Sequence, residues 1–283
     1  MFFGTTGESN AVADTLKKAA QGSSDPGWIM HHVMDANYVN FEPFGNLYLP
    51  HLQIFGIDLS ITKYIFFMWI VAAVLLILCL VAARGYKKSL VPKGFSNFFE
   101  IIILFVRDEI VKPSIGNGYE AYLPYMLTLF FFILVSNLFG LIPFSTTITA
   151  NVAVTGTLAV ISFIVTQYSG MKNHGVLNYL KGLVPSGMPV VILPLMAVIE
   201  LIGLFTKPFA LCIRLFANMV AGHIVIFSLV GLIFIMHTIY VAPVSVGFVL
   251  FIEILELLVA GIQAYVFTML TALFIGMAIH SDH

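Results

Sequence analysis

Long apolar runs separated by short polar segments dominate most of the chain. Tyr64–Ala83 supplies about the 20 residues that a helix needs to cross a hydrocarbon core. Tyr122–Ile142 and Ile148–Tyr168 have a similar length and are joined by a short turn around Pro143–Thr147. The pattern therefore predicts an N-terminal membrane span at 64–83 and, further along the chain, a transmembrane hairpin at 122–168.

Two further apolar runs are much longer than a single span requires. As helices, Pro189–Met236 and Val241–Ile279 would measure roughly 72 and 58 Å, about twice the thickness of a hydrocarbon core. Dividing each run into two spans would need a polar turn near its middle, where the sequence is apolar. We therefore expect two long, strongly tilted helices that form a hairpin at 189–279, with its turn near His237–Pro243.

Charged and apolar residues are mixed in the segment at 95–111. Its apolar residues recur at helical spacing on one side, at Phe98, Phe99, Ile102, Phe105 and Val106. An amphipathic helix that lies in the membrane interface fits this mixture better than a span.

Composition sets the fold class. Of the 283 residues, 60% are hydrophobic and 10% are charged, and the mean hydropathy is +1.00. Soluble domains are about 45–50% apolar and about 25% charged. The chain is therefore predicted to be an all-α integral membrane protein, with an aqueous, turn-rich N-terminal extension at 1–60 and a membrane domain at 61–283. A net charge of −1 without a basic block gives no reason to expect nucleic acid as a partner.

Basic residues set the expected orientation. The densest cluster follows the first span directly and consists of Arg84, Lys87, Lys88 and Lys93. The loop after the transmembrane hairpin is basic as well. Because cytoplasmic loops carry the excess of lysine and arginine, both loops should lie on the cytoplasmic side and the N-terminal extension on the other.

Arg214 stands out in the first of the two long apolar runs. An arginine side chain does not release its proton in a protein, and placing the charge at bilayer depth costs at least about 2.5–3.5 kcal/mol. Glu200, Lys207, Arg214 and Asn218 follow one another at spacings of seven, seven and four. On an ideal helix these positions lie within about 40° of one another, so one face of the helix carries a polar stripe.

The second long helix has polar residues of its own, Glu256 and Gln263, with Glu253 three positions before Glu256. In an antiparallel hairpin, facing residues have position numbers with a nearly constant sum. A turn near residue 239 or 240 makes Arg214 face Gln263 and His223 face Glu256. Polar groups at this depth normally face one another or a water-filled cavity.

These residue types can carry protons in two separate regions and can prevent protons from passing directly between the regions. Glu256 and His223 both titrate, histidine near neutral pH. Glu200 is a second carboxylate, roughly 21 Å from Arg214 along the helix axis. Arg214 relays no proton, but it can separate the two regions and attract a carboxylate from another subunit, and Gln263 can hydrogen-bond to either group. The pattern favours two offset half-channels with a fixed cation between them.

Several of these residues have plainer interpretations. Lys207 can reach the interface with its long stem, and Glu253 can do the same or pair structurally. Asn137, in the first helix of the transmembrane hairpin, is more typical of an interhelical hydrogen bond than of proton transfer. For Arg214 the plainer alternative is a structural ion pair with Glu200. No role is expected for the histidines in polar segments, His31, His32, His174, His280 and His283.

One stretch of the chain resembles a known family. The segment LCIRLFANMVAGH, from Leu211 to His223, followed by QAYVFT from Gln263 to Thr268, closely resembles subunit a of F-type ATP synthases. The likeness extends from about Ile57 onward. It implies the family's architecture, which is one N-terminal span, an interfacial helix, a transmembrane hairpin and a long tilted hairpin against a rotor ring of c subunits.

The resemblance also implies roles for individual residues. The family's essential arginine falls on Arg214, its hairpin glutamine on Gln263, its access-channel carboxylate on Glu200 and its motif asparagine on Asn218.

Two positions depart from the pattern of some bacterial members. His223 and Glu256 exchange residue types relative to those members, as in mitochondrial ones. Gly140 stands where some members carry an aspartate, so Asn137 or Glu253 would have to compensate for that side chain.

By resemblance, the chain is expected to be a stator subunit that passes protons to and from a carboxylate on the c-subunit ring and so couples proton flow to rotation and ATP synthesis. The implied partners are the c-subunit ring, the peripheral-stalk b subunits, the other ATP synthase subunits and the lipid bilayer. No cofactor or metal is expected, and H⁺ is the expected translocated ion. The chain has no GxxxxGK[ST] loop, so it should perform no ATP chemistry itself.

The expected location is a bacterial inner membrane with the N-terminal extension in the periplasm, and the mitochondrial inner membrane is the alternative. The alternative function is a secondary transporter or ion channel that binds an anion at Arg214. That function would predict broken helices in two related halves, and the sequence shows no such repeat.

Overall fold

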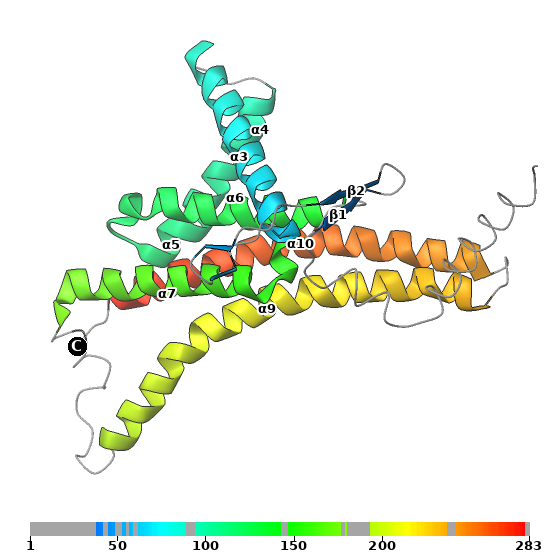
Figure 1. Cartoon of the computed structure of the whole chain (residues 1–283). Coiled ribbons are helices and arrows are strands. Elements are labelled where there is room, and N and C mark those ends of the chain that lie inside the picture. Colours follow the sequence, from blue (N-terminus) through cyan, green and yellow to red (C-terminus); the bar gives the residue numbers. More distant parts are fainter. Residues whose placement is uncertain are drawn as a thin grey trace, which may run out of the picture.

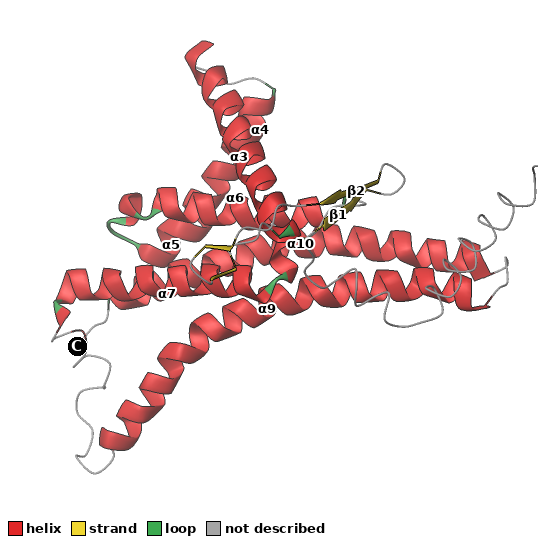
Figure 2. Cartoon of the chain, in the orientation of Figure 1, coloured by secondary structure: helices red, strands yellow, loops and turns green. Residues whose placement is uncertain are grey.

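The computed structural model describes residues 38–41, 45–48, 53–54, 57–58, 62–88, 94–142, 147–176, 179, 193–236 and 241–280. Helices make up most of these residues (Figure 2). Five of the described helices are long and apolar enough to cross a membrane. The prediction of a helical integral membrane protein is therefore confirmed.

Four short strands, which the sequence pattern did not predict, lie in the N-terminal extension (Figure 1). Strand β1 (Tyr38–Phe41) pairs antiparallel with β2 (Gly45–Tyr48), and β3 (Gln53–Ile54) pairs antiparallel with β4 (Ile57–Asp58). Strands of two to four residues are too short to show a readable alternation of polar and apolar positions. The rest of the extension, with His31 and His32, lies outside the described residues.

Helix α3 (Lys63–Lys88) is the predicted N-terminal span and continues five residues beyond the predicted end. Helix α4 (Phe95–Phe105) packs back against it, and the pair projects from the remaining helices (Figure 1). The two backbones come close where Gly85 meets Ser96, because any Cβ at Gly85 would overlap the serine side chain. The missing side chain therefore permits the contact.

The segment predicted as an interfacial helix is helical beyond its predicted end. Helix α4 continues as the π-helix η1 (Val106–Val111) and then as α5 (Lys112–Ile115). On its predicted apolar side, Phe99 is buried in the bundle and Phe98 is exposed. The wider turns of a π-helix change the directions in which side chains point, compared with an ideal α-helix. The apolar residues of η1 point inward, and η1 packs against α6 and α10.

The predicted transmembrane hairpin corresponds to α6 (Leu123–Gly140) and α7 (Val152–His174), which follow the short helices η2 (Tyr119–Ala121) and η3 (Ile148–Ala150), respectively. Helix α7 begins four residues later than predicted, after η3, and runs six residues further. Its start is capped by Asn151, whose side chain accepts a hydrogen bond from the Ala153 amide at 2.8 Å. Helix α6 packs mainly against α10, and α7 packs against both α9 and α10, so α6 and α7 do not form a separate packing unit.

Helices α9 (Leu193–Met236) and α10 (Val241–Ile279) contain 44 and 39 residues, respectively. Each long apolar run is thus one helix and not two spans, as predicted from its lack of polar interruptions. Figure 1 shows the two helices side by side along much of their length, with α9 curving away in its N-terminal part. Pro208 lies inside α9, where a proline removes a backbone hydrogen bond and favours bending. The predicted turn falls largely on residues 237–240, which lie outside the described part.

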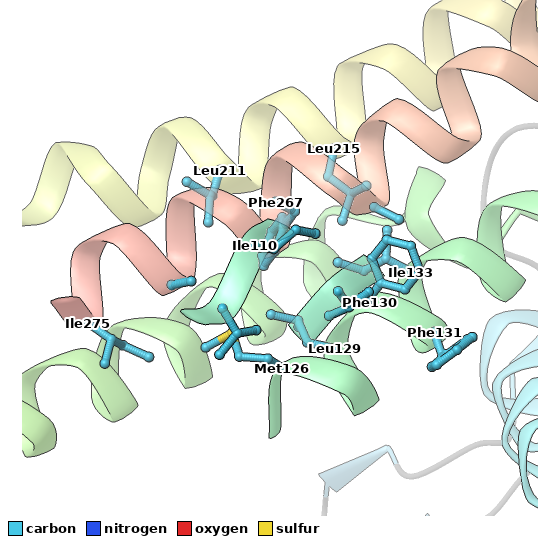
Figure 3. Packing of buried hydrophobic residues seen from close by; sticks show 14 of the residues in the cluster. Ile110, Met126, Leu129, Phe130, Phe131, Ile133, Leu211, Leu215, Phe267 and Ile275 are labelled. Carbon is cyan, nitrogen blue, oxygen red and sulfur yellow. The ribbon is translucent and has the colours of Figure 1, made fainter. Parts of the chain in front are cut away.

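The apolar core gathers around α10. Figure 3 shows Ile110, Met126, Ile133, Leu215 and Phe267 converging from η1, α6, α9 and α10, and all five are fully buried. Helix α10 contacts α5, α6, α7 and α9. This central place fixes the height and rotation of α10, and with them the positions of its polar residues.

Two histidines for which no role was expected hold the end of α10. The Nε2 atom of His174, at the end of α7, lies 2.8 Å from the backbone oxygen of Ile279. The Nε2 atom of His280 lies 2.8 Å from the backbone oxygen of Ile115 in α5. Both contacts satisfy carbonyl groups that a helix end leaves without a partner, so these two residues have structural contacts, and their lack of a part in transport stays a prediction.

Candidate functional site

Arg214 occupies the middle of α9 with its side chain exposed. Exposed apolar residues lie near it in the chain, Phe209 and Ile213 on α9, and Ile262 is exposed on α10. Among the described residues, no hydrogen bond or ion pair involves the Arg214 guanidinium, and the alternative ion pair with Glu200 is not observed. A permanent charge therefore stands exposed in a largely apolar helix without an ionic partner in the described part of the chain.

The register rule placed Gln263 opposite Arg214, but in the described part of the chain the hydrogen bond of Gln263 goes to another residue of α9. Its Oε1 atom accepts a hydrogen bond from Nδ2 of Asn218 at 2.9 Å, and the glutamine is only 3% exposed. Asn218 lies one helical turn beyond Arg214 on the same stripe. Residues four positions apart share a helix face, so the pairing differs from the predicted one by one turn along the same stripe.

A polar cluster lies on one side of Arg214 along α9, toward the end of that helix. There Nε2 of His223 and the hydroxyl of Thr147, which directly precedes η3, form a hydrogen bond. The carboxyl group of Glu256 lies against Gly222, where a Cβ would overlap its Oε1 atom. Glu256 therefore lies against the residue next to His223, within one residue of the predicted register. We call Thr147, His223 and Glu256 the His223 cluster.

Glu256 is buried, with 8% of its surface exposed, and its Oε1 atom has no hydrogen-bond partner among the described residues. Burying a carboxyl group without such a partner is costly. Glu253, one turn earlier on α10, is half-buried. The helix thus presents two carboxyl groups in succession, the deeper of them beside the backbone of α9.

Asn137 has the structural role that its residue type suggested. It is 1% exposed, and its Oδ1 atom accepts a hydrogen bond from the hydroxyl of Thr149 at 2.6 Å. This bond ties η3 to the end of α6. It thereby fixes the segment that carries Thr147 into the His223 cluster.

A cavity of about 210 Å³ lies on the other side of Arg214. Glu200 and Lys207 from α9 line it together with Thr166 and Gln167 from α7. The Nζ atom of Lys207 lies 5.4 Å from the ring centroid of Phe274 on α10, so the side chain turns into the bundle and does not follow the helix toward an interface. We call this space the Glu200 cavity.

Tyr179 closes part of the Glu200 cavity from the segment after α7. Its hydroxyl donates a hydrogen bond to Oε1 of Gln167 at 3.0 Å, and burial raises the pKa of this tyrosine. Gly170 makes the approach possible, because a Cβ there would overlap the tyrosine ring. The cavity is thereby bounded by polar groups from α7 and from the segment after it, as well as by α9.

The two polar regions thus lie at opposite sides of Arg214 along α9. The residues that sequence reasoning missed are Thr147, Tyr179, Gly170 and Gly222, and for Gly140 it missed the contact with Thr147. A threonine in a turn or a glycine in an apolar helix carries no distinctive local pattern. The described residues contain no group of three or more histidine, cysteine or acidic side chains that could hold a metal ion.

The fold and these regions define a helical integral membrane protein with titratable groups buried at membrane depth. A sequence model of the family described as ATP synthase A chain matches residues 65–276. The chain is 51% identical over 258 residues to ATP synthase subunit a of Chloroherpeton thalassium, covering 90% of this chain and 77% of that protein. It is 49% identical over 281 residues to ATP synthase subunit a 2 of Chlorobaculum tepidum, covering 98% and 79%.

The chain belongs to the family of ATP synthase a subunits. It is therefore a proton-translocating membrane subunit of an F-type ATP synthase and not an enzyme on its own, and its partners include other subunits of that complex. The bacterial relatives and the apolar helices place it in a bacterial plasma membrane. A secondary transporter is correspondingly disfavoured, and α9 and α10 lack the helix breaks that such a function would predict.

Proposed function

We propose that Arg214 separates two half-channels, one through the His223 cluster and one through the Glu200 cavity, and that protons pass between them on a carboxylate of a rotating partner. The observation that carries this proposal is the exposure of Arg214, without an ionic partner among the described residues, between two polar regions. A fixed cation there blocks direct proton leakage between the regions, because guanidinium does not give up its proton.

The proposed partner on this face is a ring of c subunits. Exposed apolar residues continue along both helices on either side of Arg214, among them Phe205 on α9 and Leu258 on α10. An unpaired arginine in a bilayer is costly, and intramembrane charges normally pair. A carboxylate on the ring would supply the missing partner during each encounter. The b subunits of the peripheral stalk are the proposed elements that hold this chain against rotation.

The proposed path for synthesis runs from the periplasm to the cytoplasm, with the N-terminal extension on the periplasmic side. Protons reach the ring carboxylate past His223 and Glu256, and the neutralised group moves into the lipid. After almost a full turn it releases its proton toward Glu200 as Arg214 attracts the anion. The membrane potential supplies about 2.3 kcal/mol per charge per 100 mV, so several protons must pass for each ATP. Asn218 and Gln263 hold the two helices in register beside Arg214.

The test is ATP-driven proton pumping by the purified complex in lipid vesicles. Arg214→Ala should reduce coupled pumping to background while the complex still assembles. Arg107→Ala is the matched control, because Arg107 is a half-exposed arginine outside the spans whose ion pair with Asp108, at 2.9 Å, is a surface contact of small energetic value. Normal pumping by Arg214→Ala would sink the proposal. Running each assay with and without sodium identifies the ion, and sodium-dependent pumping would contradict H⁺ as the translocated ion.

A further inference from the structure

Thr147 occupies a helix-capping position without capping the helix. It directly precedes η3, its backbone oxygen accepts a hydrogen bond from the Ala150 amide at 3.0 Å, and its backbone is extended. A threonine at such a position normally turns its hydroxyl back to accept a hydrogen bond from an amide of the following turn. Here the side chain makes no capping bond. Its hydroxyl instead meets Nε2 of His223, 76 positions further along the chain.

Gly140 makes this arrangement possible. A Cβ at Gly140 would overlap the hydroxyl oxygen of Thr147 and both carbons beyond its Cα. Thr147 itself is buried, with 3% of its surface exposed. The end of α6 is therefore shaped to receive this one side chain, and the hydroxyl has no room to turn away from the imidazole toward α6.

The chemistry of a hydroxyl suits a partner that changes its protonation state. A threonine hydroxyl donates a hydrogen bond to an unprotonated imidazole nitrogen and, after rotation, accepts one from a protonated nitrogen. A carbonyl could only accept and an ammonium could only donate. Thr147 can thus hold the His223 ring in one orientation before and after a proton arrives.

We propose that Thr147 is a positioning residue for proton transfer at His223, keeping Nε2 aimed along the path in both protonation states. The inference rests on the proposed function, in which protons pass through the His223 cluster. The titratable group that α10 contributes to this cluster is Glu256, and Glu253 lies one turn earlier on the same helix. The end of α6 and η3 contribute Asn137 and Thr149, which do not titrate. The hydroxyl is therefore the neutral group in contact with the imidazole, and the acidic groups approach from α10.

Three variants test the proposal in the purified complex. Thr147→Val keeps the shape and removes the hydroxyl, Thr147→Ser keeps the hydroxyl, and Gly140→Ala keeps Thr147 but pushes its hydroxyl aside. The readouts are the amount of assembled complex, the initial rate of ATP-driven proton pumping, and the dependence of that rate on the pH of the compartment facing the His223 cluster. Arg214→Ala is run alongside to test the proposed function separately.

We expect Thr147→Val and Gly140→Ala to pump roughly two- to tenfold more slowly, the factor that the loss of one ordinary hydrogen bond produces, and their pH profiles to move. Thr147→Ser should pump within about twofold of the unchanged protein, with its pH profile in place. Unchanged pumping and pH profile in Thr147→Val, beside an inactive Arg214→Ala, would overturn the positioning role alone. The positioning role would also be overturned if Thr147→Ser pumped as slowly as Thr147→Val, because the loss of packing and not the loss of the hydroxyl would then explain both rates. If Thr147→Val fails to assemble, Gly140→Ala decides: a slowed rate with an unmoved pH profile overturns the proposal.

Discussion

Gly222→Ala isolates the position of the Glu256 carboxyl group without altering any titratable residue. Gly222 precedes His223 on α9, and a Cβ at this position would overlap Oε1 of Glu256. The obstructing atom is the far end of a flexible side chain, so the carboxyl group moves while the two helices keep their places. The substitution therefore displaces one member of the His223 cluster and leaves its chemistry intact.

The effect on stability should be small, because two opposing contributions nearly cancel. Alanine is favoured over glycine inside a helix by about 0.8–1.0 kcal/mol. Forcing Glu256 off its preferred rotamer costs about 0.5–1.5 kcal/mol. The effect on transport should be large, because displacing a reacting group by about 1 Å can cost about a hundredfold in rate. We expect assembly to be normal and pumping to fall by at least about tenfold.

The measurement is ATP-driven pumping per assembled complex, and Gly156→Ala is the matched control. Gly156 lies inside α7, where a Cβ would stand 3.8 Å from Sγ of Cys212, an ordinary contact distance. This control should assemble and pump normally. Normal pumping by Gly222→Ala would refute the reasoning, because the carboxyl group of Glu256 would then either lie elsewhere or have no part in transport. Loss of assembly in both variants would assign the effect to helix packing.

Two further substitutions probe the bundle. Exchanging His223 and Glu256 in one double variant should retain more pumping than either single change, because the exchange keeps both groups in the cluster; a double variant no better than the singles would contradict their proximity. Gly276→Ala should destabilise the protein by about 1–3 kcal/mol, because a Cβ there would overlap the backbone oxygen of Ser114, which cannot rotate away. Thermal unfolding of the purified complex measures this loss, and an unchanged transition would contradict the close approach of α5 and α10.

The helical spans could be predicted because the signals for them are local. An apolar run of sufficient length must form a helix in a bilayer, since no other conformation of a single segment satisfies its backbone groups. The absence of polar turns inside the two long runs was enough to predict that α9 and α10 are single helices. The strands at 38–58 and the π-helix at 106–111 were missed, because each is shorter than the window over which a period can be read.

The polar stripe on α9 was also predictable, because residues spaced by seven share a face whatever surrounds the helix. The pairing across the hairpin was predictable only to within a turn. A sum of position numbers placed His223 near Glu256 and Arg214 opposite Gln263, but Gln263 bonds to Asn218, one turn from Arg214, and Arg214 is exposed. The roles of these residues in transport remain predictions for the assays above.

From the amino acids alone, the length of each apolar run and the spacing of the charges within it already specified a membrane bundle with a cation between two titratable regions. Both properties depend on neighbours along the chain and on the bilayer. The contact between Thr147 and His223 depended on folding, because the two residues are 76 positions apart in the chain. It also needs the space that Gly140, on α6, leaves for the side chain of Thr147. No local pattern encodes such a contact, which arises only when α6, η3 and α9 pack against α10 at one height and rotation.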